Sequence, residues 1–252
     1  MIIGLTIVAM GTSAPEAAVS VTSSLAGQND MSVANVVGSN FFNVLVVLGV
    51  SSIIAKLPVQ EETIKKDTPF LILVSILLLV FGINLKLGRI EGLALLGLFT
   101  YFLVNTIKSA KKATEDDSLE TGETAIAIET QTSSEISLPK TILVSLVGIA
   151  GIVLGGDMVV NSATSIATSL GMSANLVGLT IVAVGTSLPE FVTSIVAIKK
   201  GETEIAIGNV IGSNLFNILL VLGLAAVINP ISMSMLAVSY THLRAHETRS
   251  NL

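Results

Sequence analysis

Apolar residues occur along this chain in seven long runs that more polar connections separate. The hydrocarbon core of a bilayer takes roughly 20 apolar residues per helix. A helix also satisfies all of its backbone hydrogen bonds within lipid. The pattern therefore predicts seven membrane-spanning helices, at about residues 2–25, 33–55, 69–85, 90–107, 141–169, 175–198 and 204–228.

Two parts of the chain repeat each other. Residues 4–55 align without a gap with residues 178–229, at an offset of 174, and 25 of the 52 pairs are identical. The shared blocks read Gly-Leu-Thr-Ile-Val-Ala-x-Gly-Thr-Ser-x-Pro-Glu and Gly-Ser-Asn-x-Phe-Asn. Matched helices are five spans apart, and because that number is odd, the two copies are predicted to cross the membrane in opposite directions.

The composition agrees with a polytopic, all-α membrane protein. Hydrophobic residues make up 51% of the chain and charged residues 12%, and the mean hydropathy is +0.84. The absence of cysteine excludes a disulfide framework and thiolate metal sites. The sequence has neither a basic patch for nucleic acid nor a glycine-rich phosphate loop. We therefore expect a protein that is not an enzyme, with no cofactor, no nucleic-acid partner and no obligate protein partner.

The charges of the connections predict the orientation. Nine Lys and Arg residues fall in the loops of one side and two in those of the other. The positive-inside rule makes the first side cytoplasmic. That side includes residues 108–140, an acidic and Ser/Thr-rich segment that we interpret as a solvated linker. It separates a first repeat, residues 1–107, from a second, residues 141–238.

The first shared block gathers oxygen atoms on one side of a helix. Thr12 lies four residues before Glu16, and Ser13 lies three before it. Pro15 has no N–H to donate and clashes with the carbonyl of Gly11, so the helix is expected to kink there. Unwound carbonyls of broken membrane helices commonly coordinate cations. The second repeat carries the same residue types at Gly185, Thr186, Ser187, Pro189 and Glu190.

The second shared block adds a hydroxyl and an amide. Ser39 and Asn43 are one helical turn apart and share a face, as do Ser213 and Asn217. Hydroxyl, amide, carboxylate and carbonyl oxygens suit hard cations such as Ca²⁺ or Na⁺ better than Zn²⁺ or copper. The two blocks together predict a cation site built from both repeats.

Glu16 and Glu190 are the strongest indication of that site. A charged residue at the centre of a membrane helix costs roughly 2.5 to 3.5 kcal/mol. Neither matching span contains Lys or Arg to pair with the carboxylate. Inverted repeats pack around a pseudo-two-fold axis, so the two carboxylates are expected to meet near the midplane. They then need a cation or a shared proton between them.

Other repeated residues are interpreted as structural. The repeated glycines are expected to let helices pack closely, at Gly4, Gly38, Gly49, Gly178, Gly212 and Gly223. Four asparagines are expected to bridge helices, namely Asn35, Asn40, Asn209 and Asn214. Hydroxyl groups that can bond to their own helix are Thr6, Ser20, Thr180 and Ser194. Asp157, in the fifth span, either pairs outside the chain or caps the apolar run.

The paired blocks resemble the α1 and α2 repeats of sodium/calcium exchangers, in the cation/calcium antiporter superfamily, over roughly residues 1–235. The closest likeness is to bacterial calcium/sodium antiporters. The resemblance implies ten helices in two inverted halves and a multi-pass protein of the bacterial inner (plasma) membrane. It also implies alternating access to a central site where Na⁺ and Ca²⁺ compete. The implied ligands are Thr12, Ser13, Glu16, Ser39, Asn43, Thr186, Ser187, Glu190, Ser213 and Asn217, with the carbonyls of Ala9 and Ala183.

The resemblance leaves alternatives open. Calcium/proton exchangers of the superfamily carry Gly-Asn-x-x-Glu in place of Gly-Thr-Ser-x-Pro-Glu, so Ca²⁺/H⁺ antiport ranks second. Many members, notably potassium-dependent ones, have Asp where this chain has Asn217. The neutral amide lowers the negative charge of the site to two and argues against K⁺ dependence.

The two ends of the chain depart from the family pattern. The first repeat lacks an opening helix and the second lacks its last two, so we expect about seven of ten helices. Residues 239–252 hold both histidines and two of the three arginines. We interpret this segment as a non-native tail and neither histidine as a metal ligand. An inactive fragment that binds cations without carrying them is therefore a further alternative.

Overall fold

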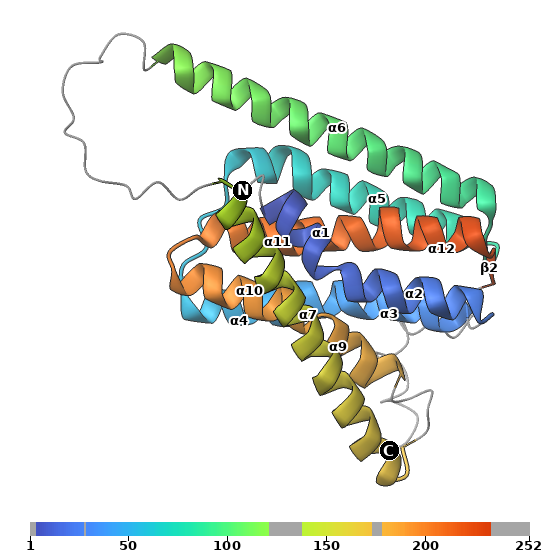
Figure 1. Ribbon diagram of the computed structural model, residues 1–252. Coiled ribbons are helices and arrows are strands. Elements are labelled where there is room, and N and C mark those ends of the chain that lie inside the picture. The colour runs from blue at the N-terminus through green and yellow to red at the C-terminus, as the bar shows by residue number, and fades with distance from the viewer. Residues whose placement is uncertain (1–3, 28, 121–137, 173–177, 233–252) are drawn as a thin grey trace, which may run out of the picture.

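The computed structural model describes residues 4–27, 29–120, 138–172 and 178–232 (Figure 1). The π-helices are η1 (Gly4–Val8), η2 (Asn43–Val47), η3 (Thr63–Asp67), η5 (Gly178–Val182) and η6 (Asn217–Leu222). The α-helices are α1 (Ala9–Thr12), α2 (Ala14–Leu25), α3 (Asn29–Phe42), α4 (Leu48–Ile54), α5 (Thr68–Gly82), α6 (Arg89–Glu120), α7 (Leu138–Ser169), α9 (Ala183–Thr186), α10 (Leu188–Lys199), α11 (Thr203–Phe216) and α12 (Gly223–Ile228). Two short strands are β1 (Lys86–Leu87) and β2 (Ile231–Ser232).

Within the described residues, each predicted span overlaps helical structure. Among the described residues, three unbroken helices are long and apolar enough to cross a membrane: Ser32–Ile54, Arg89–Ser109 and Thr203–Ile228. A fourth candidate consists of Thr180–Thr186 and Leu188–Lys199, which meet at a bend of 41°. Helix α6 continues to Glu120, so residues 108–120 of the predicted linker are helical. The predicted tail, residues 239–252, lies outside the described residues.

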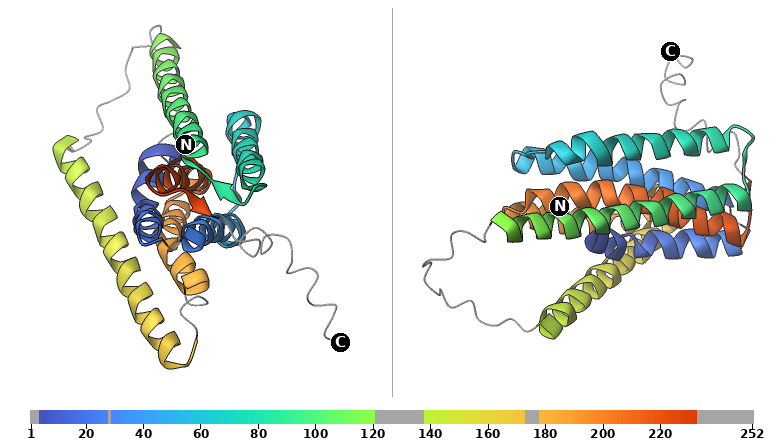
Figure 2. Two further views of the ribbon diagram at one scale, coloured as in Figure 1. Left: turned by 90° about the vertical axis from the view of Figure 1, so that its right-hand side faces the viewer. Right: turned by 90° about the horizontal axis from the view of Figure 1, so that it is seen from above.

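The segment α11–η6–α12 lies at the centre of the molecule. In its apolar stretch 72% of the residues are buried, compared with 22% for Ser32–Ile54 and 17% for Arg89–Ser109. Helix α6 packs along α12, and η1 packs along α11. Figures 1 and 2 show the central segment surrounded by helices of both repeats. Its aliphatic side chains make a large part of the core, with Leu215, Leu219, Leu222 and Ala225 fully buried.

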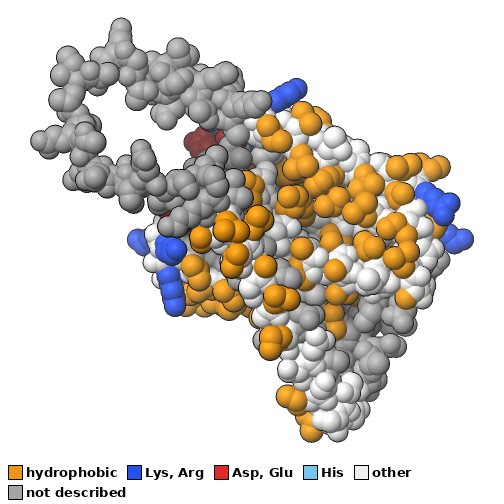
Figure 3. Space-filling view, viewed as in Figure 1, with side chains coloured by type: hydrophobic (Ala, Val, Ile, Leu, Met, Phe, Trp, Pro, Cys, Tyr) orange, Lys and Arg blue, Asp and Glu red, His pale blue; other side chains and the backbone are white. Residues whose placement is uncertain are grey.

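The outer surface is strongly apolar. Figure 3 shows hydrophobic side chains across the middle of one face, with Lys and Arg towards its edges. On α5, five aliphatic side chains are more than half exposed, namely Ile72, Leu73, Ile76, Leu79 and Val80. A soluble protein rarely exposes so large an apolar area, whereas lipid solvates it at no cost.

Glycines bring the broken helices into direct contact with α3 and α11. A Cβ on Gly212 would lie 2.6 Å from the carbonyl oxygen of Leu5, and one on Gly38 would lie 3.1 Å from the Cβ of Ala183. A Cβ on Gly4 would likewise lie 2.6 Å from the carbonyl oxygen of Ile205. The predicted role of glycine in close packing is confirmed at these positions. At Gly49 it is wrong within the described part of the chain, because a Cβ there would meet no atom within 4 Å.

A two-stranded antiparallel ladder was not predicted. Lys86 pairs with Ser232 and Leu87 with Ile231. The ladder joins the turn between α5 and α6 to the segment that follows α12, at one end of the bundle (Figure 1). The described fold is therefore helical with one short ladder, and not strictly all-α.

Candidate cation site

Both repeats contain a helix that breaks at a serine. Ser13 separates α1 from α2 with φ −82° and ψ 6°, and Ser187 separates α9 from α10 with φ −89° and ψ 4°. Pro15 and Pro189 lie in the first turn of the following helix. Backbone N–H groups of a first turn have no partner within the helix, so proline costs no hydrogen bond there. The predicted kinks are therefore present as breaks.

The two breaks face each other. The hydroxyl of Ser13 donates to Oε1 of Glu190 at 3.0 Å, and that of Ser187 donates to Oε1 of Glu16 at 2.9 Å. Each serine thus bonds to the carboxylate of the other repeat. Both carboxylates are 0% exposed. The arrangement puts the two acidic groups in one interior cluster, as the inverted repeat predicts.

The second shared block of each repeat also lies against the break of the other. The hydroxyl of Ser39 lies 3.4 Å from that of Thr186 and donates to the carbonyl of Ala183 at 3.4 Å. In the matching position, the hydroxyls of Ser213 and Thr12 lie 3.5 Å apart.

The carbonyls named by the resemblance lie at the same place. Thr12 donates to the carbonyl of Ala9 at 3.4 Å, and Thr186 donates to that of Ala183 at 3.2 Å. These carbonyls follow directly on the π-helices η1 and η5. π-Helical turns inside longer helices occur frequently at functional sites.

Asn43 and Asn217 begin the other matched pair of π-helices, η2 and η6. Both side chains are 0% exposed. Helix α10, which carries Glu190, packs against η2, and α2, which carries Glu16, packs against η6. Each amide therefore lies on an element that contacts the carboxylate-bearing helix of the other repeat.

Four buried oxygens of this cluster have no hydrogen-bond partner in the described part of the chain. They are Oε2 of Glu16, Oε2 of Glu190, Oδ1 of Asn43 and Oδ1 of Asn217. Buried polar atoms without hydrogen-bond partners are rare in folded proteins, and a bound ion is one common reason for them. Here two carboxylates and two amides each keep one free oxygen.

The ionisable side chains of the cluster, Glu16 and Glu190, are both acidic. The charges of Glu16 and Glu190 act on each other. The ion pairs of Lys65 with Glu61 and of Lys66 with Glu62 lie at the surface, away from the cluster. No basic side chain of the described residues therefore neutralises the buried carboxylates.

Two further asparagines stabilise the backbone of the site. Asn35 donates to the carbonyl of Glu16 at 3.3 Å and to Ser20 at 3.0 Å. Asn209 donates to the carbonyl of Glu190 at 3.3 Å and to Ser194 at 3.1 Å. The prediction that these residues bridge helices is confirmed.

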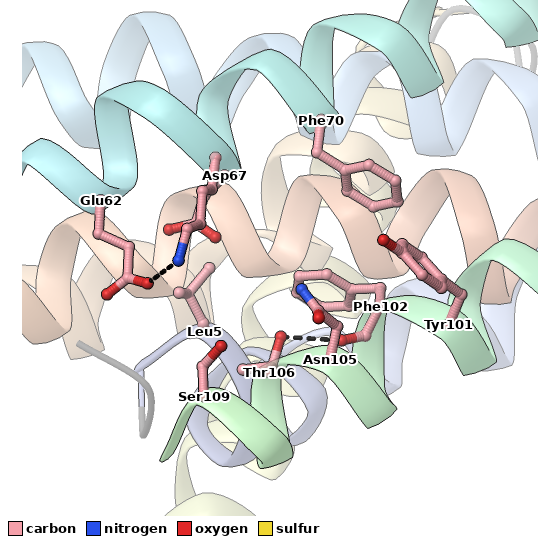
Figure 4. A pocket seen from close by; sticks show the side chains of 10 residues that line it. Leu5, Glu62, Asp67, Phe70, Tyr101, Phe102, Asn105, Thr106 and Ser109 are labelled. Carbon is pink, nitrogen blue, oxygen red and sulfur yellow. Dashed lines mark hydrogen bonds and ion pairs between the residues drawn. The ribbon is translucent and has the colours of Figure 1, made fainter. Parts of the chain in front are cut away.

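A separate cavity of about 300 Å³ lies between the start of α5 and the α6 helix (Figure 4). None of the predicted ligands lines it. Its walls include Asp67, whose Oδ2 has no hydrogen-bond partner among the described residues. Burial, and then the nearby Glu62, raise the pKa of the Asp67 carboxyl to about 6, while Lys66 opposes them.

Comparison with known proteins places the chain in a family. The family described as sodium/calcium exchanger protein matches residues 1–108 and 140–245, and so includes the first residues of the predicted tail. CaxA of Alkalimonas amylolytica is 44% identical over 234 residues, which cover 91% of this chain and 70% of that protein. The sodium/calcium exchanger MaX1 of Methanosarcina acetivorans is 31% identical over 268 residues, which cover 95% of this chain and 77% of that protein.

Solved structures agree with the sequence relatives. A structure of the sodium-calcium exchanger NCX_Mj, soaked with Na⁺ and Sr²⁺, matches with a TM-score of 0.75 at 30% identity. The match covers 94% of this chain and 74% of that one. Family, relatives and fold coincide over both repeats. The chain therefore belongs to the sodium/calcium exchanger family and is an ion antiporter of the membrane, not an enzyme.

Proposed function

We propose that the chain exchanges Na⁺ for Ca²⁺ at the cluster around Glu16 and Glu190. The observation that carries the proposal is the set of four buried oxygens without partners, two from each repeat. Ca²⁺ takes six to eight oxygen ligands, including carboxylates, amides and carbonyls. The cluster supplies these groups, together with the hydroxyls of Thr12, Ser13, Ser39, Thr186, Ser187 and Ser213.

The charge of the cluster explains why the two ions would compete. Two carboxylates balance one Ca²⁺, and the same two charges accept Na⁺ with help from neutral oxygens. Each ion then needs the same carboxylates, so the two cannot occupy the site together. An ion shifts the balance of inward-facing and outward-facing states only by its differential affinity for them. Mutually exclusive occupancy couples the two fluxes in this way.

The relatives support this choice of ions. MaX1 is named as a sodium/calcium exchanger. NCX_Mj structures were obtained after soaking with Na⁺ and Ca²⁺ or Sr²⁺. The neutral Asn217 keeps the site at two negative charges, which argues against a requirement for K⁺. We further propose the bacterial inner membrane as the location, with residues 108–140 on the cytoplasmic side, as the loop charges indicate.

Ca²⁺ uptake into proteoliposomes tests the proposal. An outward Na⁺ gradient is expected to drive uptake by the full chain. Glu16→Gln and Glu190→Gln are each expected to lower the flux to that of empty liposomes, because each removes half of the charge that balances Ca²⁺. The matched control is Glu61→Gln, the same change at an exposed surface ion pair.

Each other result selects a different function. Undiminished flux in both buried variants would refute the proposed site. Flux that ignores Na⁺ and follows a pH gradient would favour Ca²⁺/H⁺ exchange. Ca²⁺ binding without gradient-driven flux would make the chain a cation-binding fragment.

A further inference from the structure

Asn40 and Asn214 lie beside the cluster without belonging to the predicted ligands. We propose that these two asparagines are positioning residues that fix the amide orientation of Asn217 and Asn43, so that each amide presents its oxygen to the cation. The inference rests on the proposed function, because it concerns how that site is made fit for a cation.

In each of two hydrogen bonds between the repeats, the proposed ligand asparagine is the donor and the positioning asparagine is the acceptor. Nδ2 of Asn217 donates to Oδ1 of Asn40 at 3.0 Å, and Nδ2 of Asn43 donates to Oδ1 of Asn214 at 3.2 Å. The amide nitrogen of each ligand residue is thereby engaged by the other repeat. What remains free on Asn43 and Asn217 is the oxygen, and both oxygens are buried without a partner among the described residues.

Backbone carbonyls determine this direction. Nδ2 of Asn40 donates to the carbonyl of Asn214 at 3.3 Å, and Nδ2 of Asn214 donates to the carbonyl of Asn40 at 3.5 Å. A carbonyl oxygen can only accept, so the side chain that faces it must present its NH₂ group. The oxygen of Asn40 then points to Asn217, and an oxygen can be satisfied there only by the NH₂ of that amide.

An amide needs such orientation, whereas a carboxylate does not. Asparagine offers one acceptor end and one donor end, and the donor end repels a cation. Without Asn40, the NH₂ of Asn217 would lose its acceptor, and rotation would let it donate to the free oxygen of a neighbouring carboxylate. Cation binding would then have to break that bond and leave a buried donor unsatisfied. Aspartate at position 217 would present an oxygen in either orientation.

Calcium affinity in a set of double variants tests the inference on the full chain in detergent. Asn40→Ala is expected to weaken Ca²⁺ binding about tenfold, the effect of one unsatisfied buried group. In the Asn217→Asp background the same change is expected to cost less than about twofold. In the Asn43→Asp background it is expected to keep its full cost.

The matching pair in the other direction, Asn214 and Asn43, gives an independent measurement. It tests the inference even if the Asn40→Ala variant does not fold. The loss of Ca²⁺ affinity caused by Asn214→Ala should disappear in the Asn43→Asp background and persist in the Asn217→Asp background. Asn35→Ala is the matched control, because Asn35 donates to Glu16 and Ser20 and accepts from Thr186, but bonds to neither ligand amide. Its cost should be the same in all backgrounds.

The outcomes separate this inference from the function on which it rests. If the parent chain binds Ca²⁺ and Glu16→Gln abolishes binding, but Asn40→Ala costs the same in all backgrounds, the positioning role is wrong and the site stands. If the parent chain does not bind Ca²⁺, the proposed function fails and the positioning role fails with it.

Discussion

Buried carboxylate oxygens without partners lie in two places among the described residues, the interior cluster and the cavity beside α5. In the cluster, the free oxygens of Glu16 and Glu190 face a site built by both repeats. In the cavity, Asp67 directly precedes α5, and its carboxyl lies near that of Glu62. Its surroundings are its neighbours Glu62 and Lys66 and the polar side chains that α6 contributes, Tyr101, Asn105, Thr106 and Ser109.

Asp67 makes the stability of the fold depend on pH. The pKa of an unfolded aspartate is about 3.9, and that of Asp67 in the fold is about 6. Between these values the folded state binds more protons, so stability falls as the pH rises from about 4 to about 6 and stays low above that. Asp67→Asn should therefore raise Tm at pH 7.5 and change it little at pH 4.5.

Thermal unfolding in detergent at the two pH values measures this effect. Because Asp67 is only half-buried, solvent screens its charge, and about 1 kcal/mol or a Tm shift of roughly 2 to 4 °C is expected. The control is Glu61→Gln, which removes an exposed carboxyl that does not line the cavity. An equal gain of Asp67→Asn at both pH values would show that the carboxyl does not act through its charge.

At the scale of the elements, matched interruptions shape the site. η1 and η5 precede the two broken helices, and η2 and η6 follow the two serine blocks, so each repeat carries the same two π-helical turns. A π-helical turn shifts the face of every later residue on its helix. The π-helical turns begin at Asn43 and Asn217, directly after α3 and α11 end. The residues that follow therefore lie on a different side of the helix than an unbroken α-helix would give them.

Close packing between elements is most severe at Gly212. A Cβ there would lie 2.7 Å from the Cβ of Ala9 as well as 2.6 Å from the carbonyl oxygen of Leu5. Gly212→Ala should therefore push α11 away from the broken helix and cost about 1 to 3 kcal/mol. Gly49→Ala, where a Cβ has open space, should be neutral or slightly stabilising, since alanine favours helix.

Thermal unfolding of both glycine variants compares these costs. The expected result is a lower Tm for Gly212→Ala alone. A Tm equal to that of the parent chain would mean that α11 and the broken helix are not in the tight contact described above.

At the scale of the whole molecule, the contacts come in pairs related by the inverted repeat. The bonds of Ser13 and Ser187 to the opposite carboxylates are one pair, and those of Asn35 and Asn209 to the carboxylate-bearing helices are another. The repeat also has an unmatched part. A Cβ on Gly223 would meet the side chain of Leu96 on α6 at 3.1 Å, whereas the matching Gly49 has open space around it.

Much of this arrangement could be predicted from the sequence. The prolines predict where the first broken helix kinks, and the internal repeat predicts a second kink at the matching position. The free-energy cost of a charge within the membrane predicts that Glu16 and Glu190 need a partner. The π-helical turns could not be predicted, because aliphatic residues fit either helix type and packing decides between them. The direction of the Asn40 and Asn214 amides also depends on backbone carbonyls of the opposite repeat, which only the folded chain brings near.

Competition between the two ions tests the central claim most directly. Ca²⁺ binding to the full chain in detergent is measured at rising Na⁺ concentration, with choline replacing Na⁺ at constant ionic strength. If both ions need the carboxylates of Glu16 and Glu190, the apparent Kd for Ca²⁺ rises with Na⁺ while the number of Ca²⁺ sites stays constant. A Kd for Ca²⁺ that does not change with Na⁺ would contradict a shared site.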